Sequence, residues 1–304
     1  MQPTFHQLKV FEAAARHGSL TRAAEELCLS QPTVSVSMKQ LSKTVGFPVF
    51  ERIGKQLYLT EVGHQLLSTC YSIFEELDQF GMLLNDLQGT TQGKLYLAAV
   101  TTCKYFLPRL LGSFCGQYPG INISLKITNH LQLEKRMAES LDDLYFFSHQ
   151  PSYIDLKVQP VMKNPLVVVA QPSHPLVGKK NIAIANLNQE RFIIRELGSG
   201  TRKAIQDLFS KHQVNVKIKL ELGNDEAIKQ AIIDGLGISV LSHHSLDSQD
   251  YTDLAILDIE NFPIEQQWSV AYLSEKHLSV VARTFLNYFF SITDQNGLNL
   301  NHFC

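Results

Sequence analysis

The stretch from Ser19 to Leu41, SLTRAAEELCLSQPTVSVSMKQL, constrains the fold most, because it holds two short runs of helical spacing with few polar residues between them. The first run covers residues 21–27, and the second extends from Ser30 to about Val45. Ser30 suits the start of the second helix because its hydroxyl can accept a free backbone N–H, and Pro32 fits the first turn. A further helix is predicted over residues 5–16, so the chain begins with a three-helix unit.

The helix predicted from Ser30 to Val45 has two unlike faces. The apolar stripe that we expect to be buried consists of Val34, Met38, Leu41 and Val45. The opposite face carries short hydrogen-bonding side chains and positive charge: Pro32, Thr33, Val36, Lys39 and Lys43, flanked by Gln31, Ser35 and Gln40. Small hydroxyls allow a helix to approach a surface closely, and glutamine can read base edges. This face is typical of a recognition helix in the major groove of DNA.

The segment after these helices, residues 50–63, predicts a β-hairpin with its turn at Gly54 and Lys55. Such a wing would place Arg52 and Lys55 at phosphates or in the minor groove. Residues 1–60 carry seven Lys and Arg against four Glu, a net charge of +3, whereas the whole chain has a net charge of −2. A basic N-terminal segment on an otherwise acidic chain favours contact with a polyanion at one end of the protein. The alternative is a structural three-helix subdomain with ordinary caps.

The first sixty residues resemble the winged helix-turn-helix of LysR-type transcriptional regulators. The resemblance is carried, in order, by the segments AAEEL, SQPTVS, VFER and LTEVG. It implies that a face made of Gln31, Pro32, Thr33, Ser35 and Lys39 meets bases or backbone of double-stranded DNA, and that Arg52 and Lys55 serve the wing. The expected boundaries are a DNA-binding domain over residues 1–60, a linker helix over 61–88 and an effector-binding domain over 89–304.

The predicted linker helix carries an apolar stripe with alternating spacings of four and three residues. Its members are Leu66, Cys70, Ile73, Leu77, Phe80, Leu84 and Leu87. This a/d pattern is typical of a coiled-coil seam. We expect the seam to pair with a second copy in a homodimer or homotetramer, as the resemblance also implies. The alternative is that the stripe packs on the protein's own body.

The remainder of the chain alternates strand-like and helix-like runs in two sets, residues 94–171 and 191–242, and then returns with residues 267–290. Alternation of this kind predicts parallel βαβ units. Two such sets suggest two α/β subdomains with a cleft between them, an architecture like that of periplasmic binding proteins. The fold class is therefore α/β with a mostly α-helical winged head.

Ligands of α/β folds lie beyond the carboxyl ends of strands, next to helix N-termini. The polar residues expected at these positions are Thr101, Thr102, Asn129, Arg195, Ser199, Thr201, Arg202 and Asn224. The segment GSGTR, residues 198–202, could be a Gly-rich turn with a threonine cap, but two nearby arginines favour a small anionic ligand. We therefore predict that these side chains bind an anionic effector.

The body also resembles the effector domain of LysR-type regulators, in segments such as NPLVVVAQPSHPL and FIIRELGSGTR. It is most similar to the branch that controls carbon-fixation and inorganic-carbon-uptake genes. That resemblance implies a response to phosphorylated metabolites such as ribulose bisphosphate or phosphoglycolate, or to NADPH in some members. Activation or repression, the target promoters, and the choice between dimer and tetramer are left open.

Other functions are less compatible with the sequence. A solute-binding protein without a DNA role would suit the body alone, but the basic head and the lack of a secretion pattern argue against it. We do not expect the protein to be an enzyme, because neither of the catalytic motifs G-x-S-x-G and H-E-x-x-H occurs in the sequence. The five cysteines form no C-x-x-C, so we expect a reducing, cytoplasmic setting without disulfides, metal or cofactor. No apolar run reaches membrane-spanning length, which predicts no membrane partner.

Overall fold

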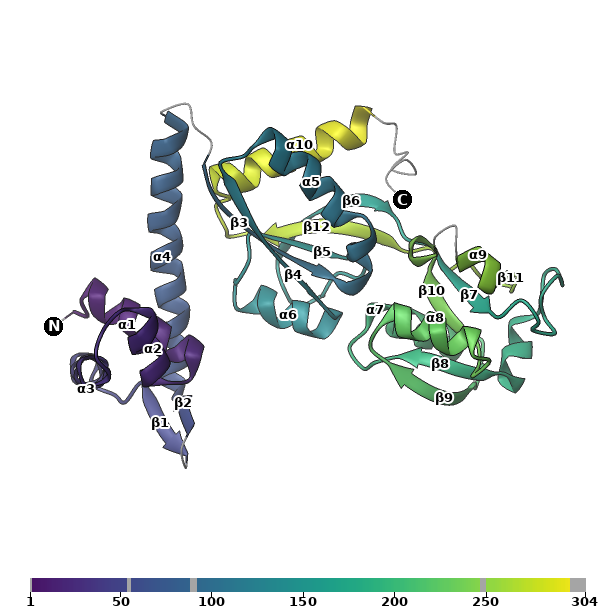
Figure 1. Ribbon diagram of the computed structural model, residues 1–304, viewed down its shortest axis with the longest axis horizontal. Helices are drawn as coiled ribbons and strands as arrows, with labels where there is room; N and C mark the ends of the chain where they lie inside the picture. Colours follow the sequence, from purple (N-terminus) through teal and green to yellow (C-terminus); the bar gives the residue numbers. More distant parts are fainter. Residues whose placement is uncertain (1, 54–55, 88–91, 247–249, 296–304) are drawn as a thin grey trace. The chain divides into compact units, whose positions relative to one another are not determined.

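The computed structural model describes residues 2–53, 56–87, 92–246 and 250–295 (Figure 1). The chain divides into two compact units, Met1–Leu84 and Asn85–Cys304. We refer to the first as the head and to the second as the body, and describe each by itself. In the described ranges, no helix combines the length and the apolar character needed to cross a membrane.

The head consists of three short helices, a hairpin and one long helix. Their bounds are α1 (Phe5–His17), α2 (Leu20–Glu26), α3 (Gln31–Val45), β1 (Phe50–Ile53), β2 (Gln56–Leu59) and α4 (Glu61–Leu87). Each of the three short helices begins at a capping hydroxyl. The side chains of Thr4, Ser19 and Ser30 each accept a hydrogen bond from the backbone N–H of the residue three positions later. The glycines at the ends of α1 and α3, Gly18 and Gly46, adopt the left-handed conformation.

The predicted buried stripe of α3 lies in the core of the head. Val34 and Leu41 are fully buried and Met38 is nearly so, and they pack with Phe11 of α1. The hairpin pairs β1 and β2 in antiparallel register, with Phe50 opposite Leu59 and Ile53 opposite Gln56. The predicted turn at Gly54 and Lys55 lies outside the described residues. The helices and the two strands thus agree with a winged helix-turn-helix.

The first subdomain of the body is a five-stranded sheet in the order β4-β3-β5-β12-β6. Its strands are β3 (Gly93–Val100), β4 (Ile121–Thr128), β5 (Leu144–Phe147), β6 (Leu156–Lys163) and β12 (Gln267–Leu273). Strand β3 pairs in parallel with β4 and β5, whereas β12 is antiparallel to β5 and β6. Helices α5 (Leu107–Gln117) and α10 (Val280–Gln295) cover one face and α6 (His130–Ala138) the other, as Figure 1 shows. A 3-10 turn, η1 (Thr101–Tyr105), follows β3.

The second subdomain contains the remaining strands. They are β7 (Leu166–Ala170), β8 (Arg191–Arg195), β9 (Lys217–Leu222), β10 (Ser239–Ser242) and β11 (Ala255–Leu257). The main helices are α7 (Gly200–Lys211) and α8 (Asp225–Ile233), with a short α9 (Asp250–Asp253) and two further 3-10 turns, η2 (Ile184–Gln189) and η3 (His243–Ser245). Two layers of apolar side chains enclose the sheets, including fully buried Val168 and Val240 in one and Val169 and Ile228 in the other.

The prediction of parallel strands is only partly correct. Strands β8 and β9 are parallel, but β7 lies between β10 and β11 and is antiparallel to both. No α-helix lies in the described segment between β7 and β8, and hydrophobic periodicity carries no information about strand direction. Strands β6 and β11 were not predicted from the sequence. Pro160 interrupts the strand pattern of β6, which is tolerated because β6 lies at the sheet edge.

Candidate functional site

The outward face of α3 is the candidate DNA-reading surface. Gln31, Pro32, Thr33 and Lys39 are exposed and Ser35 is half-buried. The hydroxyl of Ser30 accepts a hydrogen bond from Thr33 N at 3.3 Å, and its Oγ lies 2.8 Å from Thr33 Oγ1. Because the cap holds Thr33, the first turn of α3 presents its polar side chains in a fixed geometry, as close approach to DNA requires.

The wing residues are placed only in part. Arg52 lies on β1, opposite Leu57 of β2, and its side chain is exposed. Lys55 lies outside the described residues. An exposed arginine near the turn of a hairpin can contact phosphates. The position of Arg52 therefore suits the predicted role, which remains a proposal.

The apolar stripe on α4 divides into two parts. Four of its members are solvent-exposed: Ile73 (37%), Leu77 (52%), Phe80 (58%) and Leu84 (43%). Leu66 instead packs on the core of the head together with the fully buried Cys70, which departs from its predicted place in an intermolecular seam. The reason is that the first turns of α4 lie against the three-helix unit. The side chain of Leu87 lies outside the described part of the structure.

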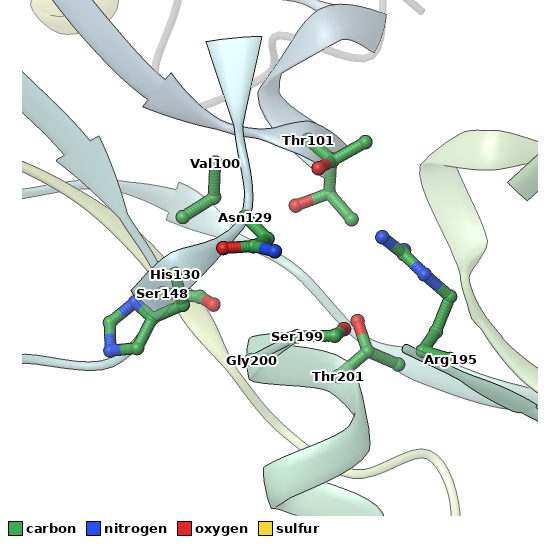
Figure 2. Close-up of a pocket in the computed structure, with 10 residues that line it drawn as sticks. Val100, Thr101, Asn129, His130, Ser148, Arg195, Ser199, Gly200 and Thr201 are labelled. Atoms are coloured by element: carbon green, nitrogen blue, oxygen red, sulfur yellow. The ribbon is translucent and has the colours of Figure 1, made fainter. Parts of the chain in front are cut away.

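A polar cavity in the body gathers most of the predicted effector residues. It is lined by Val100, Thr101, Thr102, Asn129, His130, Ser148, Arg195, Ser199, Gly200 and Thr201. These residues follow the carboxyl ends of β3, β4, β5 and β8 and begin α7, as expected for ligand sites of α/β folds. Figure 2 shows Thr101, Arg195 and Thr201 directed toward a common space, with the amide of Asn129 facing it from the other side.

Arg195 brings a positive charge to this cavity, although carboxylates compensate it. The side chain is 2% exposed, and its Nη1 donates to Asp225 Oδ1 at 2.5 Å while its Nε donates to Glu196 Oε2 at 2.8 Å. Burial lowers the pKa of Arg195, but the charge of Asp225 and the bond to Glu196 outweigh burial and raise that pKa. The guanidinium therefore stays charged, and an anion reaching it would share it with two carboxylates.

Tyr105 of η1 extends the same network. Its hydroxyl lies 3.2 Å from Asp225 Oδ2 and 3.1 Å from Glu226 Oε1, as a donor to both carboxylates. Burial, followed by these two negative charges, raises the pKa of Tyr105. A phenol that keeps its proton can only donate here, so Tyr105 holds the carboxylate that in turn holds Arg195.

Neutral groups supply the rest of the cavity wall. Asn129 caps α6 by accepting from Gln132 N at 3.0 Å, and Ser199 caps α7 by accepting from Arg202 N at 3.4 Å. Thr102 Oγ1 accepts from Nε1 of the buried Trp268 at 3.0 Å. Helix N-termini carry partial positive charge, so the starts of α6 and α7 both favour an anion in the cavity.

Two predicted effector residues do not line this cavity. Arg202 Nη1 donates to the backbone carbonyl of Arg195 at 2.9 Å and to Glu221 Oε2 at 2.7 Å. Asn224 is exposed and caps α8 by accepting from Glu226 N at 2.8 Å. The physical reason is helix phase, because successive residues of a helix lie about 100° apart, so Thr201 faces the cavity and Arg202 turns away.

The site prediction omitted His130 and Ser148, although both line the cavity. Ser148 follows β5, so the strand-end rule would have found it. His130 is 6% exposed; its Nε2 lies 3.1 Å from Glu134 Oε1 and its ring stacks edge-on with that of His149. Burial, the largest influence, lowers the pKa of His130. The neutral imidazole therefore predominates at neutral pH.

The cavity is narrow in this structure. Its volume is about 20 Å³, well below the ~300–1,000 Å³ typical of sites for drug-sized molecules. Over the described residues, no three His, Cys, Asp or Glu side chains gather in a way that could hold a metal ion. The wall offers hydroxyls, an amide, two helix N-termini and one guanidinium, a donor set that suits an oxyanion.

Both units of the chain match known protein families. Residues 5–64 match the bacterial regulatory helix-turn-helix protein of the lysR family, and residues 88–291 match the LysR substrate binding domain. The chain is 50% identical over 289 residues, 95% of either chain, to the HTH-type transcriptional activator CmpR of Synechocystis sp.. It is 42% identical over 300 residues to the RuBisCO operon transcriptional regulator of Acidithiobacillus ferrooxidans, covering 98% of this chain and 97% of the relative.

A solved structure is similar to the body. The regulatory domain of CcmR from Synechocystis PCC6803, in complex with 2-PG, matches with a TM-score of 0.65 and 57% sequence identity. The match covers 66% of this chain and 98% of that domain. Together with the winged head and the two α/β subdomains, these matches show that the chain belongs to the LysR family of bacterial DNA-binding transcriptional regulators.

Proposed function

We propose that this regulator binds a small phosphorylated carboxylate in the cavity around Arg195 and thereby changes how its head binds promoter DNA. The observation that carries the proposal is the convergence of Arg195, the hydroxyls of Thr101 and Thr201, and the N-termini of α6 and α7 on one space. The ligand class follows from the relative that is solved with 2-PG, which we read as 2-phosphoglycolate.

The chemistry of the cavity fits a phosphate better than a carboxylate alone. A phosphate offers several acceptor oxygens, and the cavity presents donors from more than one direction. Arg195 is already paired with Asp225 and Glu196, so most of the binding energy must come from hydroxyls and backbone N–H groups rather than from free positive charge. Selectivity then depends on fit, and a ligand with only one anionic group would leave donors unpaired.

The regulated genes are proposed from the relatives. A transcriptional activator and a RuBisCO operon regulator share half and two-fifths of this sequence over nearly its full length. We therefore assign the chain to the control of carbon-fixation-related genes in the cytoplasm. In this assignment 2-phosphoglycolate reports the metabolic state, and the head delivers the response to DNA.

The assembly is proposed from α4. Ile73, Leu77, Phe80 and Leu84 present an exposed apolar stripe with the spacing of a coiled coil. A second copy would cover this stripe and place two heads for two DNA half-sites. The residue boundaries proposed for the DNA-binding domain, the linker helix and the effector-binding domain are 1–60, 61–88 and 89–304.

Calorimetric titration of the full-length protein tests the effector proposal. We expect 2-phosphoglycolate to bind, and glycolate or inorganic phosphate to bind at least tenfold more weakly. Thr201→Val keeps the side-chain shape but removes a cavity hydroxyl, so it should weaken 2-phosphoglycolate binding about tenfold, as loss of one hydrogen bond to a charged group does. Thr284→Val, on α10, serves as the matched control. Equal binding by wild type and Thr201→Val would contradict the site.

A further inference from the structure

Val36 is an apolar side chain at the centre of an otherwise polar surface. It is 53% exposed and lies on α3, on the side away from the buried Val34 and Met38. A β-branched residue at an exposed helix position lowers helix propensity and gains nothing from burial. Such a local conflict with folding preference points to a functional reason.

The surroundings of Val36 form an open groove between α3 and the start of α1. Its walls include Pro32, Thr33, Val36 and Gln40 from α3, together with Thr4, the N-cap of α1, and Gln7 in its first turn. Thr4 and Gln7 hold one another in a capping box, with Thr4 N donating to Gln7 Oε1 at 2.9 Å and Gln7 N donating to Thr4 Oγ1 at 3.2 Å. This wall is therefore preorganised.

Within the groove, Pro32, Val36 and Gln40 follow one another at intervals of four residues, which places them on one stripe of α3. Ser37 also lines the groove; it is 8% exposed, and its hydroxyl has no hydrogen-bond partner within the described structure. Lys39 and Lys43 are exposed on the same helix. This face of α3 therefore offers apolar contact, hydrogen-bonding groups and positive charge. Such a face suits a polyanionic partner that carries apolar groups on its surface.

In the major groove of DNA, the apolar group on a base-pair edge is the C5-methyl of thymine. We infer that Val36 packs against a thymine methyl and makes the regulator sensitive to thymine at one position of each half-site. The stiffness of the valine side chain fixes this contact. The inference rests on DNA binding through α3 and adds to it a residue that selects sequence without a hydrogen bond.

The test begins with in vitro selection of duplexes from a random library by the full-length protein. Each thymine of the selected duplex is then replaced by deoxyuridine, which removes only the methyl group, and dissociation constants are measured by fluorescence anisotropy. One replacement should weaken wild-type binding about fourfold, since burying one methyl group is worth ~0.8 kcal/mol at ~1.4 kcal/mol per tenfold. Val36→Ala should bind the thymine and deoxyuridine duplexes equally.

The control variant is Lys43→Ala, which should weaken binding to both duplexes alike and keep the fourfold difference between them. The inference is overturned if no deoxyuridine replacement affects the wild type, or if Val36→Ala retains the same penalty. Selection that enriches no duplex would overturn DNA binding itself and this inference with it. Enrichment without a methyl effect would overturn the inference alone.

Discussion

Arg195 and Asp225, thirty positions apart in sequence, form a buried ion pair in which Nη1 and Oδ1 are 2.5 Å apart and each side chain is 2% exposed. The pair joins the end of β8 to the first residue of α8. Tyr105 approaches the same carboxylate from η1. The cavity proposed to bind an anion is thus built around a cation whose charge is already shared, which makes the orientation of Arg195 as important as its charge.

Asp225→Asn should destabilise the protein by about 3 kcal/mol, because it leaves a buried guanidinium with one carboxylate partner fewer. Denaturant unfolding of the full chain measures the change. Asp234→Asn, at an exposed position just after α8, should change the free energy of unfolding by less than about 0.5 kcal/mol. Similar effects of the two substitutions would show that the Arg195–Asp225 pair contributes no net stability.

Leu77→Asp combined with Leu84→Asp should reduce the oligomer to monomers, because carboxylates would have to be buried in the seam between two α4 helices. Light scattering of the purified protein gives the mass directly. Ser72→Asp, also exposed on α4, is the matched control and should leave the mass unchanged. An unchanged mass in the double variant would mean that α4 does not hold the copies together.

Lys39→Ala should weaken DNA binding and reduce the slope of log affinity against log salt by about 1, as expected when one phosphate contact is lost. Dissociation constants measured across a salt series on the selected duplex give this slope. Lys180→Ala, which removes an exposed lysine of the body, should leave the slope as it is. If Lys39→Ala keeps the wild-type slope, Lys39 contacts no phosphate.

Stability should fall in acid partly because of His130. Burial lowers its pKa in the folded state from the ordinary value of 6.5, with Glu134 opposing and with His149 and Lys203 adding to the shift. The unfolded chain therefore binds more protons below pH 6.5, and the free energy of unfolding decreases as pH falls through that value. His130→Gln should lose less stability between neutral and mildly acidic pH, as measured by denaturant unfolding.

Part of the acid loss will remain in His130→Gln, because burial also lowers the pKa of His244. The free energy of unfolding of the variant should therefore still depend on pH, but less steeply than that of the wild type. Identical dependences in the two proteins would contradict a shifted pKa at His130.

Local signals in the sequence were sufficient to predict most of the head. Ser30, Pro32 and the stripe of Val34 and Leu41 act within one helix, where caps and periodicity determine the structure. The departure of Leu66 from the seam has a different origin. Leu66 and Leu77 have the same place in the spacing pattern. Only the packing of α4 against the three-helix unit determines that Leu66 contacts the core of the head while Leu77 stays exposed.

The cavity was predictable only up to the ends of its strands. Thr101, Asn129 and Ser199 reach it because strand order and helix starts place them there. The direction of Arg202 depends on helix phase, and the pairing of Arg195 depends on Asp225, a residue distant in sequence. The sequence alone shows neither which side of α7 faces the cavity nor a contact between residues thirty positions apart, so it could not separate the position of Arg195 from that of Arg202.

The proposed coupling between effector and DNA is tested by the affinity of the full-length protein for its selected duplex, measured by fluorescence anisotropy with and without saturating 2-phosphoglycolate. We expect the dissociation constant to change by at least about fivefold, the lower range of allosteric coupling. We also expect Thr201→Val to need about ten times more ligand for the same change. A wild-type dissociation constant that is unaffected by saturating 2-phosphoglycolate would show that this ligand does not control DNA binding.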